Sequence, residues 1–134
     1  MTPEQISLVQ ISFKTKVWPV ANEAALLFYN RLFELDPSLK ALFNPDMSEQ
    51  WRKLMEMLWL VVHGLSEMDE LEILLESLGE RHVYYGVRPE YYPLVEEALL
   101  WMIESCMEQE FTSEANVAWR NVYGLMSGVM KQVN

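Results

Sequence analysis

Cysteine, glycine and long apolar runs are all scarce in this sequence. A single cysteine, Cys106, excludes an internal disulfide. A chain without disulfides suits a reducing compartment, so we expect a cytoplasmic location. No run of about 18 apolar residues is present, which argues against a membrane-spanning helix. The opening residues, MTPEQISLVQ, lack the basic and long apolar segments of a signal peptide, so we expect none.

Basic residues are also few. The chain has 10 Lys and Arg against 20 Asp and Glu, a formal net charge of −10. Because Lys and Arg bind phosphate groups, this balance argues against DNA or RNA and against an anionic membrane as partner. The segment 67–80 holds six acids and no base. It predicts a solvated helix face, with a docking patch for a basic partner as the alternative.

The five glycines form neither a GxGxxG nor a Walker loop, so nothing indicates a glycine-loop nucleotide site. Alternating strand patterns are absent, and apolar residues recur at helical spacing almost throughout. Thr2, Pro3 and Gln5 have the spacing of a capping box at a helix start. The sequence predicts one all-α domain over residues 1–134, with six or seven helices. The expected ranges are 3–17, 21–34, 37–43, 48–65, 69–84, 89–107 and 113–133.

Three predicted helices each place one polar side chain on an apolar face. Tyr29 shares its face with Ala25 and Leu32, Gln50 lies one turn before Leu54, and His82 lies one turn after Leu78. A buried polar group without a partner costs about 1–3 kcal/mol. Each residue therefore has two interpretations. The residue is either part of the structure, hydrogen-bonded in the core or capping a helix, or part of a pocket that surrounds something polar.

The remaining reactive side chains indicate little chemistry. His63 shares a face with Arg52, Glu56 and Trp59, opposite the leucine stripe, and is predicted to be exposed. Two histidines without a CxxC or HExxH motif make a poor zinc site. Cys106 lies on an apolar stripe and is predicted to be an unreactive core thiol. The spacing shows no catalytic Ser-His-Asp or Cys-His arrangement.

Three segments resemble the bacterial single-domain haemoglobins, which are relatives of the globin domain of flavohaemoglobins. The segments are LLFYNRLFELDPSLKALF, QWRKLMEMLWLVVHGL and LGERHVYYGVRPEYYPLVEEALL. The likeness runs nearly end to end, includes AWRNVYGL near the C-terminus, and is strongest to the short thermostable members. It implies a globin fold around haem b.

The resemblance also implies roles for individual residues. His82 would be the proximal ligand of the haem iron. Gln50 and Tyr29 would lie on the distal side, where Tyr29 donates its hydroxyl to the bound ligand. Phe43 would stack on the porphyrin, and Leu54 would line the distal pocket.

Further positions are implied around the haem edge and the proximal histidine. Lys53 would pair with a haem propionate, and Tyr85 and Val87 would contact the cofactor after the proximal helix. Tyr92 matches the position that orients the proximal histidine. Related globins have a glutamate near the end of the last helix, where this sequence has Asn134. A missing carboxylate would weaken electron donation to the iron.

From the resemblance we expect reversible and tight O₂ binding at a pentacoordinate haem iron, with Tyr29 and Gln50 as distal hydrogen-bond donors to the ligand and with CO and NO as further ligands. Oxidation of NO to nitrate with electrons from an external reductase is the second expectation, because the 134 residues contain no flavin-binding region. A haem-free globin-like sensor or interaction module is the third.

Overall fold

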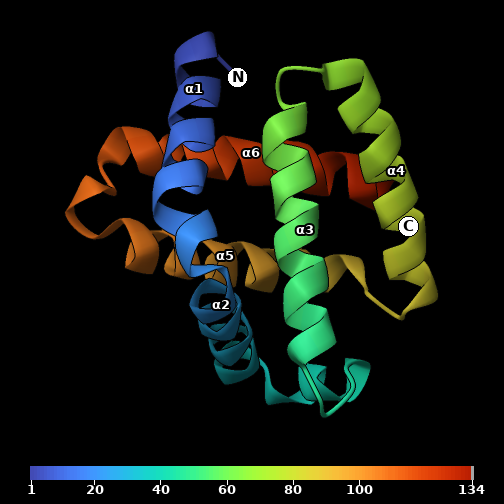
Figure 1. The fold of residues 1–134 in the computed structure, drawn as a ribbon. Coiled ribbons are helices and arrows are strands. Elements are labelled where there is room, and N and C mark those ends of the chain that lie inside the picture. Colours follow the sequence, from blue (N-terminus) through green and yellow to red (C-terminus); the bar gives the residue numbers. More distant parts are fainter. Residues whose placement is uncertain (134) are drawn as a thin grey trace.

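The computed structural model describes residues 1–133, which form helices joined by short turns (Figure 1). Six α-helices are present in this range: α1 (Pro3–Ser12), α2 (Ala21–Leu35), α3 (Ser48–Gly64), α4 (Met68–Tyr84), α5 (Tyr92–Met107) and α6 (Ser113–Gln132). Shorter helical turns connect them: η1 (Phe13–Val17), η2 (Trp18–Val20), η3 (Pro37–Leu42), η4 (Pro89–Tyr91) and η5 (Glu108–Glu110). The all-α prediction is confirmed. No helix within residues 1–133 is long and apolar enough to cross a membrane.

Local capping sets several of these boundaries. The Thr2 hydroxyl accepts from the Gln5 amide at 3.1 Å while the Gln5 side chain accepts from the Thr2 amide at 3.0 Å, which completes the expected capping box. Asp36 accepts from the Ser38 amide at 3.0 Å and starts η3. The helix expected over 3–17 forms, but it widens from α to π geometry at Phe13.

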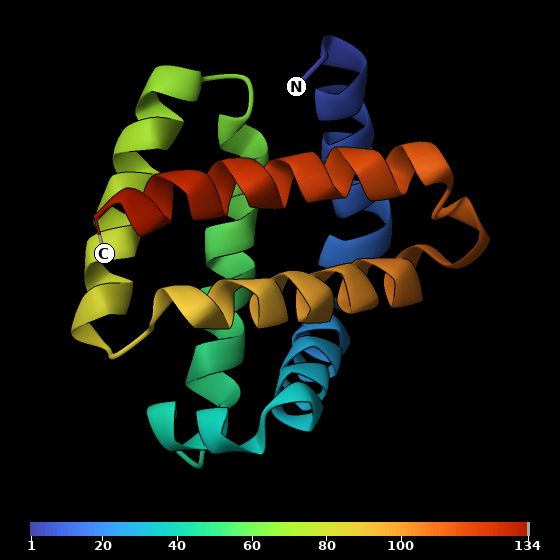
Figure 2. The same cartoon turned by 180° about the vertical axis from the view of Figure 1, so that it is seen from behind.

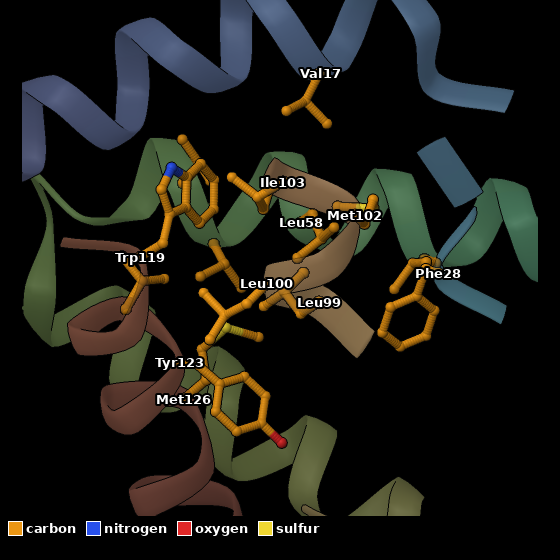
Figure 3. Packing of buried hydrophobic residues seen from close by; sticks show 14 of the residues in the cluster. Val17, Phe28, Leu58, Leu99, Leu100, Met102, Ile103, Trp119, Tyr123 and Met126 are labelled. Carbon is orange, nitrogen blue, oxygen red and sulfur yellow. The ribbon is translucent and has the colours of Figure 1, made fainter. Parts of the chain in front are cut away.

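The helices cross in two layers. In Figure 1, α5 and α6 lie behind α1, α3 and α4 and run across them, and the view from behind shows the same crossing (Figure 2). The core between the layers includes Trp119, Met102 and Ile103, each with no exposed surface (Figure 3). Burying a large apolar side chain contributes about 1.5–3 kcal/mol, so this interface stabilises the crossing. The Trp119 indole N–H donates to the Ser12 hydroxyl at 3.1 Å, which satisfies a buried polar group.

Two arrangements position the polar residues singled out above. The helices α3 and α4 run in opposite directions in both views (Figures 1 and 2), so the first turn of α3, with Gln50, and the last turn of α4, with His82, lie at the same end of the pair. The helices α4 and α6 approach very closely at Gly79. A Cβ atom there would lie 2.7 Å from the Met130 carbonyl oxygen. The only side chain that fits at position 79 is hydrogen, so glycine sets how closely α6 approaches the helix that carries His82.

Candidate functional site

A buried hydroxyl and an amide meet between α2 and α3. Tyr29 is 4% exposed, as its place on the apolar face predicts, and Gln50 is half-buried. The Gln50 Nε2 atom donates to the Tyr29 Oη atom at 2.9 Å. Since the Tyr29 oxygen accepts this bond, its own proton remains available for donation to another acceptor.

Aromatic rings surround this hydroxyl. The rings of Tyr29 and Phe43 meet edge to face with centroids 5.4 Å apart, and Phe33 lies 5.7 Å from Phe43. Leu54, one turn beyond Gln50, is also buried. Burial in this apolar environment raises the pKa of Tyr29 to about 12, although the hydrogen bond from Gln50 acts in the opposite direction. The hydroxyl therefore stays protonated and remains a donor at neutral pH.

The imidazole of His82 is held in one tautomer. Its Nδ1 atom lies 2.7 Å from the Leu78 carbonyl oxygen, one turn earlier in α4. A carbonyl can only accept, so Nδ1 carries the proton and Nε2 carries the lone pair. Burial, as the main cause, and the neighbouring Arg81 charge lower the pKa of His82, while the bond to Leu78 raises it. A neutral imidazole with a free Nε2 lone pair is the form that binds metals.

Two tyrosines lie where α5 begins. The Tyr92 hydroxyl is buried and has no hydrogen-bond partner among residues 1–133. The Tyr123 hydroxyl donates to the Tyr92 carbonyl oxygen at 2.7 Å, which ties α6 to the first turn of α5. Burial raises the pKa of both phenols. Asn134, at the position of the family's glutamate, lies outside the described residues.

Sequence reasoning did not single out Tyr123. The signal was present, because Tyr123 lies one turn after Trp119 on the buried stripe of α6. A tyrosine on such a stripe is the same kind of exception that drew attention to Tyr29.

The residues expected around the cofactor edge, Val87, Tyr85 and Lys53, differ in their environment. The Val87 amide donates to the His82 carbonyl oxygen at 2.9 Å, and the turn at Gly86 has a φ of +92°. Tyr85 is 59% exposed, with its ring 5.8 Å from that of Tyr84, and Lys53 is exposed. The structure therefore connects Val87 to His82 directly, while Tyr85 and Lys53 extend from the surface.

His63 is exposed, as predicted. Its ring stacks on Trp59 with centroids 3.8 Å apart, and its Nδ1 atom lies 2.8 Å from the Trp59 carbonyl oxygen. Cys106 is half-buried, and burial raises the pKa of its thiol. No group of three or more His, Cys, Asp and Glu side chains in residues 1–133 is placed to hold a metal ion.

The donor set fits haem. Haem iron needs only an axial nitrogen from the protein, which the Nε2 atom of His82 can supply, and its other face suits polar donors within an apolar wall. Tyr29 and Gln50 are polar groups beside the Phe43 ring, and these residues fit such a face. The all-helical fold and this donor set therefore fit a haem-binding protein.

Comparison with known proteins agrees. Residues 26–130 match the globin family, and this chain belongs to it. A neuroglobin from Tetraodon nigroviridis is 31% identical over 121 residues, covering 80% of this chain and 76% of that protein. A flavohemoprotein from Rhizobium meliloti (strain 1021) is 31% identical over 106 residues, covering 77% of this chain and 26% of that protein.

The fold is also that of solved globins. The structure of a bacterial globin from Campylobacter jejuni superimposes with a TM-score of 0.81 at 22% identity, covering 98% of this chain and 95% of that one. Membership of the family makes this chain a haem-based gas-binding globin.

Proposed function

We propose that this globin binds O₂ reversibly and tightly at the iron of haem b, with His82 as the axial ligand and CO and NO as further ligands. One observation supports tight binding above all. The buried Tyr29 hydroxyl accepts a hydrogen bond from Gln50 at 2.9 Å and keeps its proton for a ligand. The single cysteine supports a cytoplasmic site of action.

The two distal residues donate hydrogen bonds in series: Gln50 donates to Tyr29, and Tyr29 would donate to the ligand. When bound, haem would supply the iron to which O₂ binds. The Tyr29 hydroxyl would donate a hydrogen bond to the partly negative ligand, and the Gln50 amide would polarise and orient the phenol. A hydrogen bond to a charged group contributes about 1.5–3 kcal/mol, which corresponds to roughly ten- to hundredfold slower ligand release.

The other proposed contacts hold and shield the cofactor. His82 presents the lone pair of Nε2 because the Leu78 carbonyl oxygen accepts a hydrogen bond from Nδ1–H. Phe43 and Leu54 exclude water from the ligand side, and Val87 continues directly from the His82 turn. Tyr85 and Lys53, both exposed, would reach the haem edge, where Lys53 would pair with a propionate. Tyr92 would orient the His82 ring through its unpartnered hydroxyl.

The first test is the absorption spectrum. Purified protein should show an intense haem Soret band, and CO should shift the ferrous band. His82→Gly should lose the axial ligand and regain it when imidazole is added to the solution. His63→Gly is the matched control, since His63 is exposed and bonded only to Trp59 among the described residues. An unchanged ferrous-CO spectrum in His82→Gly, together with an altered one in His63→Gly, would reverse the assignment.

A second function is oxidation of NO. The relation to a flavohemoprotein over 77% of this chain favours it. One NO, one O₂ and one electron give one nitrate, and we propose that a separate reductase supplies the electron. Mixing NO with the O₂-loaded protein should yield stoichiometric nitrate. Recovery of nitrite or of unreacted NO would reject this activity.

The third alternative, a haem-free sensor or interaction module, differs from both in one observable. Such a protein shows no Soret band after expression with sufficient haem and takes up none from added hemin. The presence of His82, Tyr29 and Gln50 in the arrangement described above argues for a loaded protein.

A further inference from the structure

A lysine near the end of α6 lies against a buried ring. The Nζ atom of Lys131 is 5.7 Å from the centroid of the Tyr92 ring. Tyr92 is 5% exposed, while Lys131 is an exposed residue with its stem on the helix surface. The face of an aromatic ring attracts a cation, so this contact favours the position of the ammonium group on the Tyr92 ring over positions further out in solvent.

The packing of α4 on α6 brings this charge to the end of the molecule that carries His82. Met130 contacts Gly79 so closely that a Cβ at Gly79 would lie 2.9 Å from the Met130 Cα atom. Lys131 follows Met130 directly, and His82 follows Gly79 by one helical turn. In both views the C-terminal end of α6 lies beside α4 (Figures 1 and 2).

One carboxylate near these tyrosines is already paired. Glu96, whose charge raises the pKa of Tyr123, lies 3.5 Å from Arg120. On α4 itself, Arg81 adds a second positive charge next to His82. Lys131 is therefore a cation on the Tyr92 ring, and it forms no ion pair with a carboxylate within residues 1–133.

We propose that Lys131 raises the reduction potential of iron coordinated by His82, acting through the Tyr92 ring as a positioning residue. The inference rests on the proposed axial role of His82. Ferric iron carries one more positive charge than ferrous iron, so a nearby cation disfavours the ferric state. The ammonium group lies against the buried Tyr92 ring, so protein instead of water borders it on that side, which reduces screening.

The test is a spectroelectrochemical titration of the haem-loaded protein. Lys131→Glu should lower the midpoint potential relative to the unmodified protein, and Lys131→Gln should lower it by less. Lys131→Arg should restore the original potential, because it keeps a cation over the ring. Each variant changes an exposed helix residue, and thermal unfolding confirms that it folds.

Lys14→Glu is the matched control, since it makes the same change in net charge. Lys14 lies in η1 next to Phe13, whose ring is 6.4 Å from that of Trp119 on α6. Lys131 lies 12 residues further along the chain from Trp119, or about 18 Å along a helix. Lys14→Glu should leave the potential nearly unchanged.

Two outcomes overturn the proposal. Equal shifts in Lys131→Glu and Lys14→Glu would show an effect of net charge alone, and no shift in Lys131→Glu would remove the electrostatic role. Failure of the proposed function looks different, because an unmodified protein without a Soret band, or a His82→Gly variant with an unchanged spectrum, rejects the axial assignment itself.

Discussion

Replacing Gly79 by alanine tests the contact that sets the distance between α4 and α6. The added Cβ would lie 2.7 Å from the Met130 carbonyl oxygen, 2.7 Å from Val133 Cγ2 and 2.9 Å from Met130 Cα. Two of these atoms belong to the backbone of α6, so a side-chain rotation cannot relieve the overlap. The helices must separate, and the buried contacts around them must loosen.

The magnitude follows from two opposing effects. Overpacking a core costs about 1–3 kcal/mol, and the backbone overlap places this site near the upper value. Alanine regains about 1 kcal/mol of helix propensity over glycine. The net loss is about 2 kcal/mol. For a domain of this length, 1 kcal/mol corresponds to roughly 3–5 °C in melting temperature, so we expect a decrease of roughly 6–10 °C.

The controls are two other glycines in helix α6. A Cβ at Gly124 or at Gly128 would meet nothing within 4 Å. Alanine at either position should therefore stabilise the protein by about 0.5–1 kcal/mol and raise the melting temperature. Thermal unfolding followed by circular dichroism measures all three variants under one condition. If Gly79→Ala raised the melting temperature as the controls do, the close approach of α4 and α6 would be refuted.

Four further predictions concern the pocket and the turn after it. Tyr29→Phe should raise the O₂ dissociation rate roughly ten- to hundredfold in stopped-flow measurements, because about 1.5–3 kcal/mol of hydrogen bonding is lost; an unchanged rate would exclude the donor role. Gln50→Leu should raise the rate less and add nothing in the Tyr29→Phe background, because Gln50 donates to Tyr29; a full effect there would indicate direct contact with the ligand. The pKa of Tyr29 in the folded state is raised to about 12, so the stability that this shift contributes is complete below about pH 10 and is lost as the pH rises through the folded-state value, because the unfolded chain then binds fewer protons. Alkaline denaturation should therefore depend less steeply on pH in Tyr29→Phe. An identical pH profile in the two proteins would contradict this. Gly86→Ala, at a φ of +92°, should destabilise by about 1–2 kcal/mol in chemical denaturation, and no loss would show that the turn relaxes.

The sequence by itself determined the helices and the faces that they bury. The signals are local, because each one acts over about one helical turn, and they can therefore be recognised in the sequence alone. They are the capping at Thr2, the Asp36-Pro37 break and the apolar spacing. The same local periodicity marked Tyr29 and His82 as polar residues on apolar faces. Their proposed roles came from the likeness to other globins, because a stripe shows that a side chain points inward but not what it meets there.

Only the tertiary structure decided which inward residues meet. Gln50 and Tyr29 are 21 residues apart, and their hydrogen bond depends on how α2 and α3 cross. The contact of Gly79 with Met130 and the position of Lys131 on the Tyr92 ring depend on the packing of α6 against α4 and α5. Helical spacing assigns a residue to a face, whereas the partner of that face is set by close packing of side chains from distant parts of the chain.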